Sequence, residues 1–176
     1  MLKQIIFLST ILTSGCTTMS PQQCATQNWQ DLGYQDAIQG KASQVLKYSK
    51  MCQNSIEQPY LLGFKQGLTT YCQPQQIFKH ALQGQGAYTH CDNALSLKES
   101  FDIAHQYYVA KQDYHNAQTQ YANYMQLIGN SKTPEQDKMR YQKQLSDIEG
   151  DAERVKRKYE NTKSALARFK AEHGYA

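Results

Sequence analysis

The chain has 176 residues, a formal net charge of +4 and 40% hydrophobic residues, and its mean hydropathy of -0.73 is that of a water-facing protein. This length allows one domain, or one small domain with an appendage. The mild positive charge permits weak attraction to anionic lipids or wall polymers. It does not provide the clustered basic charge of a nucleic-acid-binding protein, so we expect no nucleic-acid partner.

The N-terminal segment, residues 1–15, is predicted to be a signal peptide. Lys3 supplies its positive start, and residues 5–12 form an apolar core that is too short to cross a bilayer. Small residues then lead into Cys16, a pattern that resembles the lipobox of bacterial lipoproteins, although Thr13 stands where Leu is more usual. In those proteins the signal is cut before the cysteine, whose sulfur carries a diacylglycerol and whose amine is acylated.

Cys16 is therefore the predicted lipidation site. The alternative is an ordinary secretory signal with Cys16 as a bystander. Multiple acyl chains make a stable anchor because each buried methylene adds about 0.8 kcal/mol. Thr17 occupies the position where Asp would favour retention in the inner membrane of a Gram-negative bacterium, so we expect an outer-membrane anchor and a chain that faces the oxidising periplasm.

An even set of cysteines is left after Cys16, as expected in a compartment where disulfides form. These are Cys24, Cys52, Cys72 and Cys91. Three pairings are open, and we favour the sequential one, Cys24 with Cys52 and Cys72 with Cys91, because it closes the shortest loops. Each bridge would contribute about 3 kcal/mol, which matters for a small module over residues 16–95. The spacing is too wide for a typical zinc site, and there is no CxxC pair for redox catalysis.

Helix-start patterns recur along the mature chain. Ser20-Pro21-Gln22-Gln23 has the residues of a capping box, with proline at the first helical position. The segments that start at Ser96 and Thr133 repeat this logic, and Pro59 and Pro74 are expected to open two short helices. No run of alternating β-branched residues is long enough to predict a strand, so the sequence predicts an all-α fold.

A weak internal repeat lies within the module. Residues 33–38 align with residues 63–68 as glycine, aromatic, two polar residues, a small residue and an aliphatic one. Small residues four apart share one face of a helix, so the repeat predicts two closely packed helices. The alternative is a shallow groove that stacks a glycan or peptide on exposed aromatic side chains, for which the candidates are Trp29, Tyr34, Tyr60 and Phe64.

From residue 96 onward, apolar and aromatic residues recur at steps of three and four. The first run is Ile103, Tyr107, Ala110, Tyr114, Ala117, Tyr121, Tyr124 and Ile128, and the second is Leu145, Ile148, Ala152, Val155, Tyr159, Thr162, Leu166 and Phe169. Such seams are typical of a coiled coil. Because Gly129 suits the left-handed end of a helix, we predict an antiparallel helical hairpin over residues 96–176. Whether it packs on the module or projects away is left open.

No pattern in the sequence indicates an active site. Asp31 and Asp36 are five residues apart and do not share a helix face well, and the five histidines form no HExxH or comparable metal pattern. A hydrolase would require a pocket that gathers Asp36 and a histidine. We therefore expect no catalytic residue, no metal ligand and no cofactor.

Several segments of the module resemble a family of small bacterial lipoproteins known as domain of unknown function 2799. They are Cys24, residues 29–40, Cys52, residues 60–74 and residues 86–91. The resemblance covers roughly residues 1–110, and it departs at Ala37, where glycine is usual, and at His80-Ala81, where Leu-Gly is usual. It implies lipidation and an envelope location, but the family has no established activity to carry over.

Together these observations predict a non-enzymatic outer-membrane lipoprotein that presents a helical interaction surface to an envelope protein in the periplasm. The alternative function is a module that binds peptidoglycan or another envelope glycan with help from a basic cluster on the second long helix. That cluster is Arg154, Lys156, Arg157 and Lys158. Acidic neighbours make a solvated, salt-bridged helix face the default interpretation of the cluster.

Overall fold

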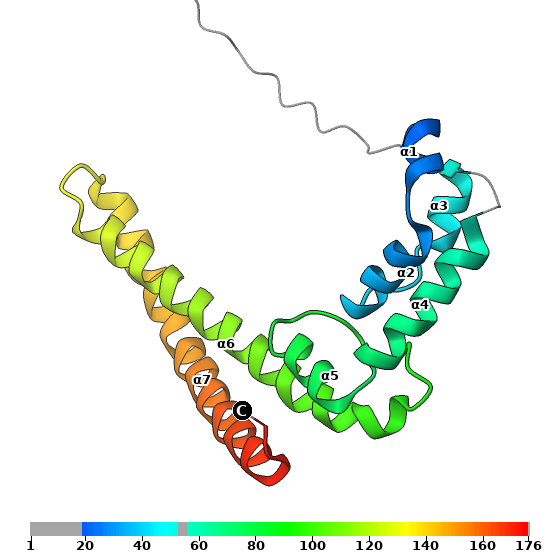
Figure 1. Ribbon diagram of the computed structural model, residues 1–176. Coiled ribbons are helices and arrows are strands. Elements are labelled where there is room, and N and C mark those ends of the chain that lie inside the picture. The colour runs from blue at the N-terminus through cyan, green and yellow to red at the C-terminus, as the bar shows by residue number, and fades with distance from the viewer. Residues whose placement is uncertain (1–18, 53–55, 176) are drawn as a thin grey trace, which may run out of the picture.

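The computed structural model describes residues 19–52 and 56–175, so the predicted signal peptide and Cys16 lie outside the described residues. The described residues form seven α-helices and no strand, which confirms the all-α prediction. The helices are α1 (Pro21–Thr26), α2 (Trp29–Ile38), α3 (Val45–Cys52), α4 (Glu57–Tyr71), α5 (Pro74–Ala81), α6 (Ala94–Gly129) and α7 (Glu135–His173). Two arms, one of α1 to α4 and one of α6 and α7, meet at α5 (Figure 1).

The first arm begins with the predicted capping box. The Ser20 hydroxyl accepts a hydrogen bond from the Gln23 backbone N–H at 3.2 Å, and the Gln23 side chain accepts one from the Ser20 N–H at 2.8 Å. The reciprocal pair satisfies two backbone donors that the first turn of a helix leaves free. A disulfide between Cys24 and Cys52 then joins α1 to the end of α3.

Helices α2 and α4 touch backbone to backbone. A methyl group on Gly33 would overlap the Tyr60 carbonyl, and one on Gly63 would overlap the Gln30 carbonyl. At Gly67 such a group would lie 2.6 Å from the Tyr34 carbonyl oxygen. From the Gln30–Gly63 contact to the Tyr34–Gly67 contact both helices advance by four residues, so the two helices run parallel (Figure 1). The close packing predicted from the internal repeat is confirmed.

The corner of the molecule is built on α5, which Pro74 opens at its first position. The second disulfide, between Cys72 and Cys91, lies at this corner. A core cluster there joins α5 to both long helices, and its buried members are Phe78, Ala81, Ala104, Leu166 and Phe169. The base of the hairpin therefore packs on the module, while its far end projects away (Figure 1).

The α6 and α7 helices pair as predicted, in antiparallel orientation. The rings of Tyr114 and Tyr159 stack with their centroids 5.1 Å apart, and Tyr124 lies 6.0 Å from Tyr141 nearer the tip. With 36 and 39 residues, the helices are about 54 and 58 Å long at ~1.5 Å per residue. No helix within the described ranges is long and apolar enough to cross a membrane.

Several predicted helix boundaries were wrong. Helix α6 starts at Ala94 with Asn93 at the N-cap, not at Ser96, whose hydroxyl instead donates to the Asn93 carbonyl at 2.8 Å. Pro59 does not open a helix but lies in the first turn of α4, where a missing N–H costs no hydrogen bond.

The turn between the two long helices also differs from the prediction. The N-cap of α7 is Pro134, one residue after the predicted Thr133. Gly129 is the last residue of α6 and is not left-handed, because the chain leaves the helix through Asn130 in an extended conformation (φ -76°, ψ 121°). The left-handed glycine ends α7 instead, at Gly174 (φ 65°).

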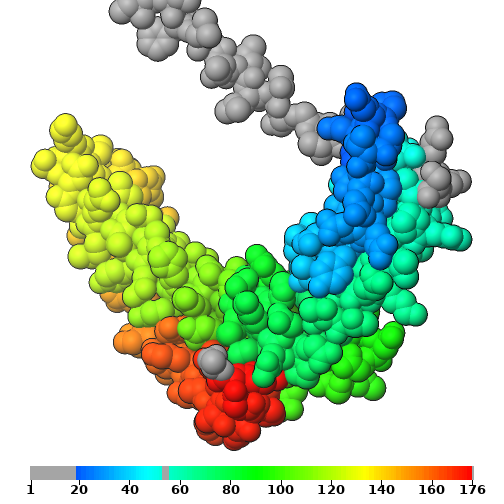
Figure 2. Space-filling model, in the orientation of Figure 1, coloured from blue at the N-terminus to red at the C-terminus, as the bar shows by residue number. Residues whose placement is uncertain are grey.

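Burial divides the hairpin into a base and a distal arm. The buried residues of the long helices are Leu97, Ser100, Ala104, Ala110, Leu166 and Phe169. None of the residues 111–165 is buried. We call this part of the hairpin the distal arm, and Figure 2 shows it separated from α1 to α4 by an open bay.

Candidate functional site

The structure contains some of the predicted site residues and leaves others outside the described ranges. Both sequential disulfides are present, Cys24 with Cys52 and Cys72 with Cys91. The lipidation site Cys16 lies outside the described residues and stays a prediction. Its nearest described neighbour along the chain is Met19, which packs against the core of the first arm.

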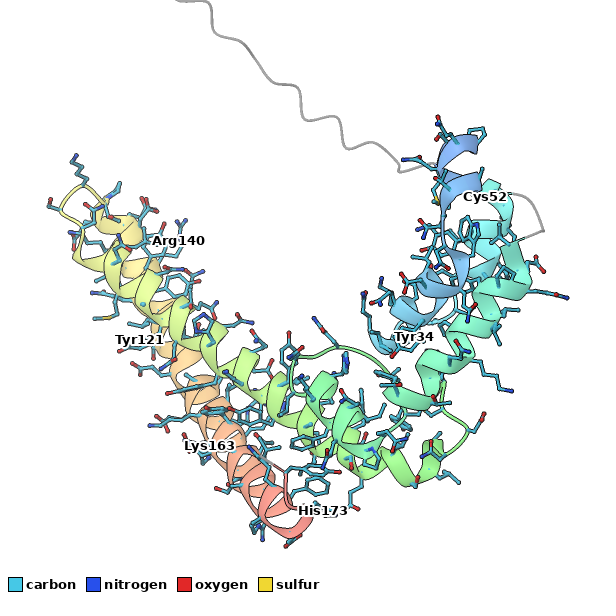
Figure 3. The ribbon with its side chains drawn as sticks, viewed as in Figure 1. Tyr34, Cys52, Tyr121, Arg140, Lys163 and His173 are labelled. Carbon is cyan, nitrogen blue, oxygen red and sulfur yellow. A yellow bond between two sulfur atoms is a disulfide. The ribbon has the colours of Figure 1, made fainter. Side chains whose placement is uncertain are left out.

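The four candidate ligand aromatics do not form an exposed platform. Trp29, Tyr60 and Phe64 are 8%, 0% and 8% exposed, and they are core residues. Tyr34 is partly buried on α2, the helix of its arm nearer the bay (Figure 3). Tyr60 and Phe64 stack with their ring centroids 6.0 Å apart. Because these rings fill the space between α2, α3 and α4, their burial does not support a groove that stacks a glycan.

A polar cluster around Asp36 lies within this arm. The Asp36 carboxylate, 2% exposed, accepts hydrogen bonds from the Tyr60 hydroxyl at 3.0 Å and the Tyr48 hydroxyl at 3.4 Å. Lys41 donates to its other oxygen at 3.0 Å. The Tyr60 hydroxyl in turn accepts from the Gln44 backbone N–H at 3.0 Å. A buried charge with this many donors is satisfied, so the cluster fixes the chain between α2 and α3.

The electrostatics of the cluster hold the phenols in their protonated form. Burial, followed by the nearby Asp36 charge, raises the pKa of Tyr48. Burial also raises the pKa of Tyr60 to about 12, with Asp36 acting in the same direction and the Gln44 hydrogen bond opposing them. Both tyrosines therefore stay donors at physiological pH and have no tendency to act as bases.

The groups that contact the Asp36 carboxylate are two phenols and an ammonium, so the histidine partner required by the hydrolase hypothesis is not among them. His80 lies elsewhere, edge-on to Tyr71 with a centroid distance of 5.1 Å. Burial, and next the positive charge of Lys79, lowers its pKa, while a backbone hydrogen bond at Ile38 raises it. Among residues 19–52 and 56–175, no three His, Cys, Asp or Glu side chains gather in a way that could hold a metal ion.

The module can now be compared with known proteins. Residues 28–110 match the family model described as "Protein of unknown function (DUF2799)". The match confirms the family resemblance predicted from the sequence for this part of the chain. Comparisons with curated proteins and with solved structures gave no match.

The DUF2799 segment coincides with the well-packed part of the molecule. It begins at Asn28, the N-cap of α2, and ends at Ala110, the last buried residue of α6. It therefore includes the glycine contact, the Asp36 cluster, α5 and the first half of α6. The distal arm lies outside it, so nothing about the arm follows from the family match.

The distal arm has two chemically different helices. Residues 114–131 of α6 and the turn contain no Asp, Glu, Lys or Arg, whereas 15 of the 29 residues 135–163 of α7 are charged. On α7 the charges pair locally, as in Arg154 with Asp151 at 2.9 Å. Lys158 also reaches across to Asp113 of α6 at 3.2 Å. The basic cluster thus largely forms the salt-bridged helix face that the sequence predicted by default.

The uncharged helix carries exposed apolar side chains. Tyr121, Met125 and Leu127 are exposed on α6, and Met139 is exposed on the facing part of α7. Figure 3 shows Tyr121 on this part of the hairpin. A groove of about 600 Å³ adjoins Tyr121 where the small residues Ala117 and Ala152 face each other. Depletion of charge with enrichment of Tyr and Met is the composition of the centre of a protein interface, which makes the distal arm the candidate functional site.

Sequence reasoning missed the partners of Asp36. It noted Asp36 itself but not Lys41, Tyr48 or the Gln44 backbone. The sequence did indicate that such partners exist, because an acidic residue on the predicted core face of a helix requires hydrogen-bond donors. The charge-free run 114–131 was equally visible in the sequence.

Proposed function

We propose that this protein is a non-enzymatic outer-membrane lipoprotein, anchored through Cys16, whose hairpin presents a protein-interaction surface in the periplasm. The observation that carries the proposal is the uncovered distal arm, in which a seam of aromatic and aliphatic residues contains no buried side chain between positions 111 and 165. A projection of this length that adds little to the core is best explained as a surface for a partner.

The anchor is supported by the sequence before the first helix. Small residues precede Cys16, and α1 begins at Pro21, so the folded part would start within a few residues of the membrane. The pairing of all four module cysteines in disulfides fits an oxidising compartment. Lipidation of Cys16 also accounts for the odd number of cysteines.

A role without catalysis is supported by the chemistry of the described side chains. The most buried carboxylate, Asp36, is saturated by donors and serves to hold the fold. The grooves of the distal arm are open and lined by alanine, glutamine and paired charges. Such surfaces suit contact with another protein better than the enclosure of a reacting small molecule.

The anchor is tested by mass spectrometry of the N-terminal peptide from the native protein. We expect cleavage before Cys16, with the cysteine carrying a diacylglycerol and an acylated amine. Cys16→Ala should leave the membrane pellet and enter the soluble fraction. An unmodified Cys16 in the membrane-bound protein would contradict this part of the proposal.

The interaction surface is tested by shortening the arm. Replacing residues 117–149 with a four-residue turn removes the outer part of both helices but keeps Leu97, Leu166 and Phe169, which pack in the core. Truncation from residue 96 would remove these core residues and is a poorer experiment. We expect the shortened protein to stay folded and anchored but to lose its crosslinks to envelope proteins in cells. Unchanged crosslinks would contradict the proposal, and retention on purified peptidoglycan by both forms would favour the glycan-binding alternative.

A further inference from the structure

One face of α6 in the distal arm is suited to contact another copy of itself. Tyr114, Gln118, Tyr121 and Met125 are spaced by four, three and four residues, so their side chains share one helix face. Tyr121 and Met125 are 38% and 48% exposed. We call these four residues the α6 stripe.

The α6 stripe borders the groove of about 600 Å³. Tyr114, Gln118 and Tyr121 line it from α6, and Ala117 and Ala152 are the small residues between the two helices. The opposite rim belongs to α7 and carries charges of both signs, namely Glu149, Glu153 and Lys156. The closest ion pair within this rim, Lys156 with Glu153, is long at 3.9 Å, so these charges can still pair with another molecule.

We propose that the α6 stripe and its groove form a two-fold interface between two copies of this chain. In a two-fold interface the same patch meets itself, so a charged residue near the axis would face its own copy at a cost of several kcal/mol. The absence of charged residues from positions 114–131 removes this repulsion over the whole helix face. The Nε2 of Gln118 donates to the Tyr114 hydroxyl at 3.0 Å. The amide still has a second N–H and its carbonyl oxygen with which to pair with its own copy.

The rim of the groove is complementary to itself in the same arrangement. When two copies pair in antiparallel fashion, Lys156 of one copy can approach Glu149 of the other. The same lysine also offsets the charge of Glu153 in its own copy, which lies near the two-fold axis. The exposed Tyr121 and Met125 provide the apolar area, and the groove offers space for a side chain of the facing copy. A second copy supplies a matching charge-free face by symmetry.

The size of the face sets the strength of the pair. Residues 114–129 of α6 form about 24 Å of helix, and a strip of that length and ~15 Å width buries roughly 360 Å² on each copy. The total of roughly 700 Å² lies below the range of stable specific interfaces, where complexes are weak and reversible. Two copies held on one membrane by a lipid anchor would meet at high local concentration. The inference rests on the proposed function only in treating the distal arm as an interaction surface.

The interface is tested by photo-crosslinking of the full chain in cells. In the test variant, a photoreactive phenylalanine replaces Tyr121 on the α6 stripe. In the matched control it replaces Asn116, which lines the groove on the opposite side of the hairpin. We expect a product of doubled mass at position 121 that contains only this chain by mass spectrometry, and at least ten times less of it at position 116. A product that contains a different protein overturns the second copy but leaves the arm an interaction surface.

Charge placed on the stripe provides the second measurement. Gln118→Lys and Gln118→Glu, at the stripe residue nearest the two-fold axis, should each reduce the doubled product at least tenfold, and coexpression of the two variants should restore a mixed product. Loss without recovery, or no loss at all, overturns the two-fold arrangement. The helical signal in circular dichroism checks that each variant is folded. Mass spectrometry of the Cys16 peptide from the same cells shows whether the anchor is present, so a missing dimer can be distinguished from a missing anchor.

Discussion

The α2/α4 pair and the α6/α7 pair both join two helices of this chain, but they use glycine in opposite ways. Between α2 and α4, methyl groups on Gly33 or Gly63 would overlap a backbone carbonyl of the other helix. Between α6 and α7 the spacing is set by tyrosine rings such as Tyr114 and Tyr159. Gly150 of α7 has nothing within 4 Å of the position that a side chain would take.

This difference separates a part of the molecule that must fit itself from a part that is free to fit something else. The module combines backbone contact, two disulfides and a buried carboxylate, so most substitutions there would disturb the fold. The distal arm has half-buried seams and open grooves, so its surface can change without loss of the helices. Stability therefore rests on the module and on the base of the hairpin that packs against it, and recognition is expected in the distal arm.

The largest expected effect is that of Gly63→Ala. The new methyl group would overlap the Gln30 carbonyl, and because the obstacle is backbone, the two helices must move apart. We expect the free energy of unfolding to fall by about 3 kcal/mol or more, measured by denaturant unfolding. Leu62→Ala is the matched control on the same helix, since Leu62 is 53% exposed and should change stability by about 0.5 kcal/mol or less. Equal stability of the two variants would show that α2 and α4 do not meet at Gly63.

Loss of the first disulfide should cost nearly as much. Replacing Cys24 and Cys52 by Ser opens a loop of sequence separation 28, for which the chain-entropy relation gives an upper value of about 3.6 kcal/mol. Hydrogen exchange should show faster exchange in α1 to α4, with amides of residues 111–165 unchanged. Equal loosening of the distal arm would contradict the separation of the molecule into two regions.

The phenol cluster of the module predicts a loss of stability in alkali. The Tyr60 pKa is raised from the usual 10.0 to about 12, so its contribution is complete below pH 10 and is lost as the pH rises toward 12. Over this window the free energy of unfolding should fall by up to about 1.4 kcal/mol per pH unit through Tyr60.

Tyr60→Phe provides the check on this pH dependence. The variant should show a shallower slope between pH 10 and 12, and a smaller slope should persist because the pKa of Tyr48 and Tyr71 is raised as well. Tyr121→Phe on the exposed arm is the control and should leave the slope as it is. A slope that Tyr60→Phe leaves unaltered would show that the Tyr60 hydroxyl does not titrate with unfolding.

Local patterns in the sequence were enough to predict much of this fold. The capping box at Ser20, the two seams of the hairpin and the close approach at Gly33 and Gly63 depend on residues that are near in sequence or regularly spaced. Loop length favoured the sequential cysteine pairing that the structure has, although three pairings were open from the sequence. Each of these features is set by local geometry, which the sequence displays directly.

Features that depend on distant contacts were not predictable in the same way. The packing of Phe78 against Phe169 joins residues 91 positions apart, and it explains why the hairpin base docks on α5. The burial of Trp29, Tyr60 and Phe64 could not be told from exposure, because an aromatic beside glycine suits a core and a binding groove equally. The N-caps of α6 and α7 were misplaced by three residues and one residue because caps without side-chain hydrogen bonds leave no pattern.

The smallest expected effect is that of Gly150→Ala, and its sign is opposite to that of Gly63→Ala. Glycine inside a helix costs about 1 kcal/mol relative to alanine, and no atom lies within 4 Å of the added methyl group. We therefore expect slower hydrogen exchange in the distal arm and a gain of up to about 1 kcal/mol. The free energy of unfolding of Gly150→Ala should be measured at low and at high protein concentration. Gly150 is next to Glu149 on the rim of the groove, so the added methyl group would also touch a second copy bound there. If the substitution raises the free energy of unfolding at low concentration but lowers it at high concentration, Gly150 lies in the interface with a second copy.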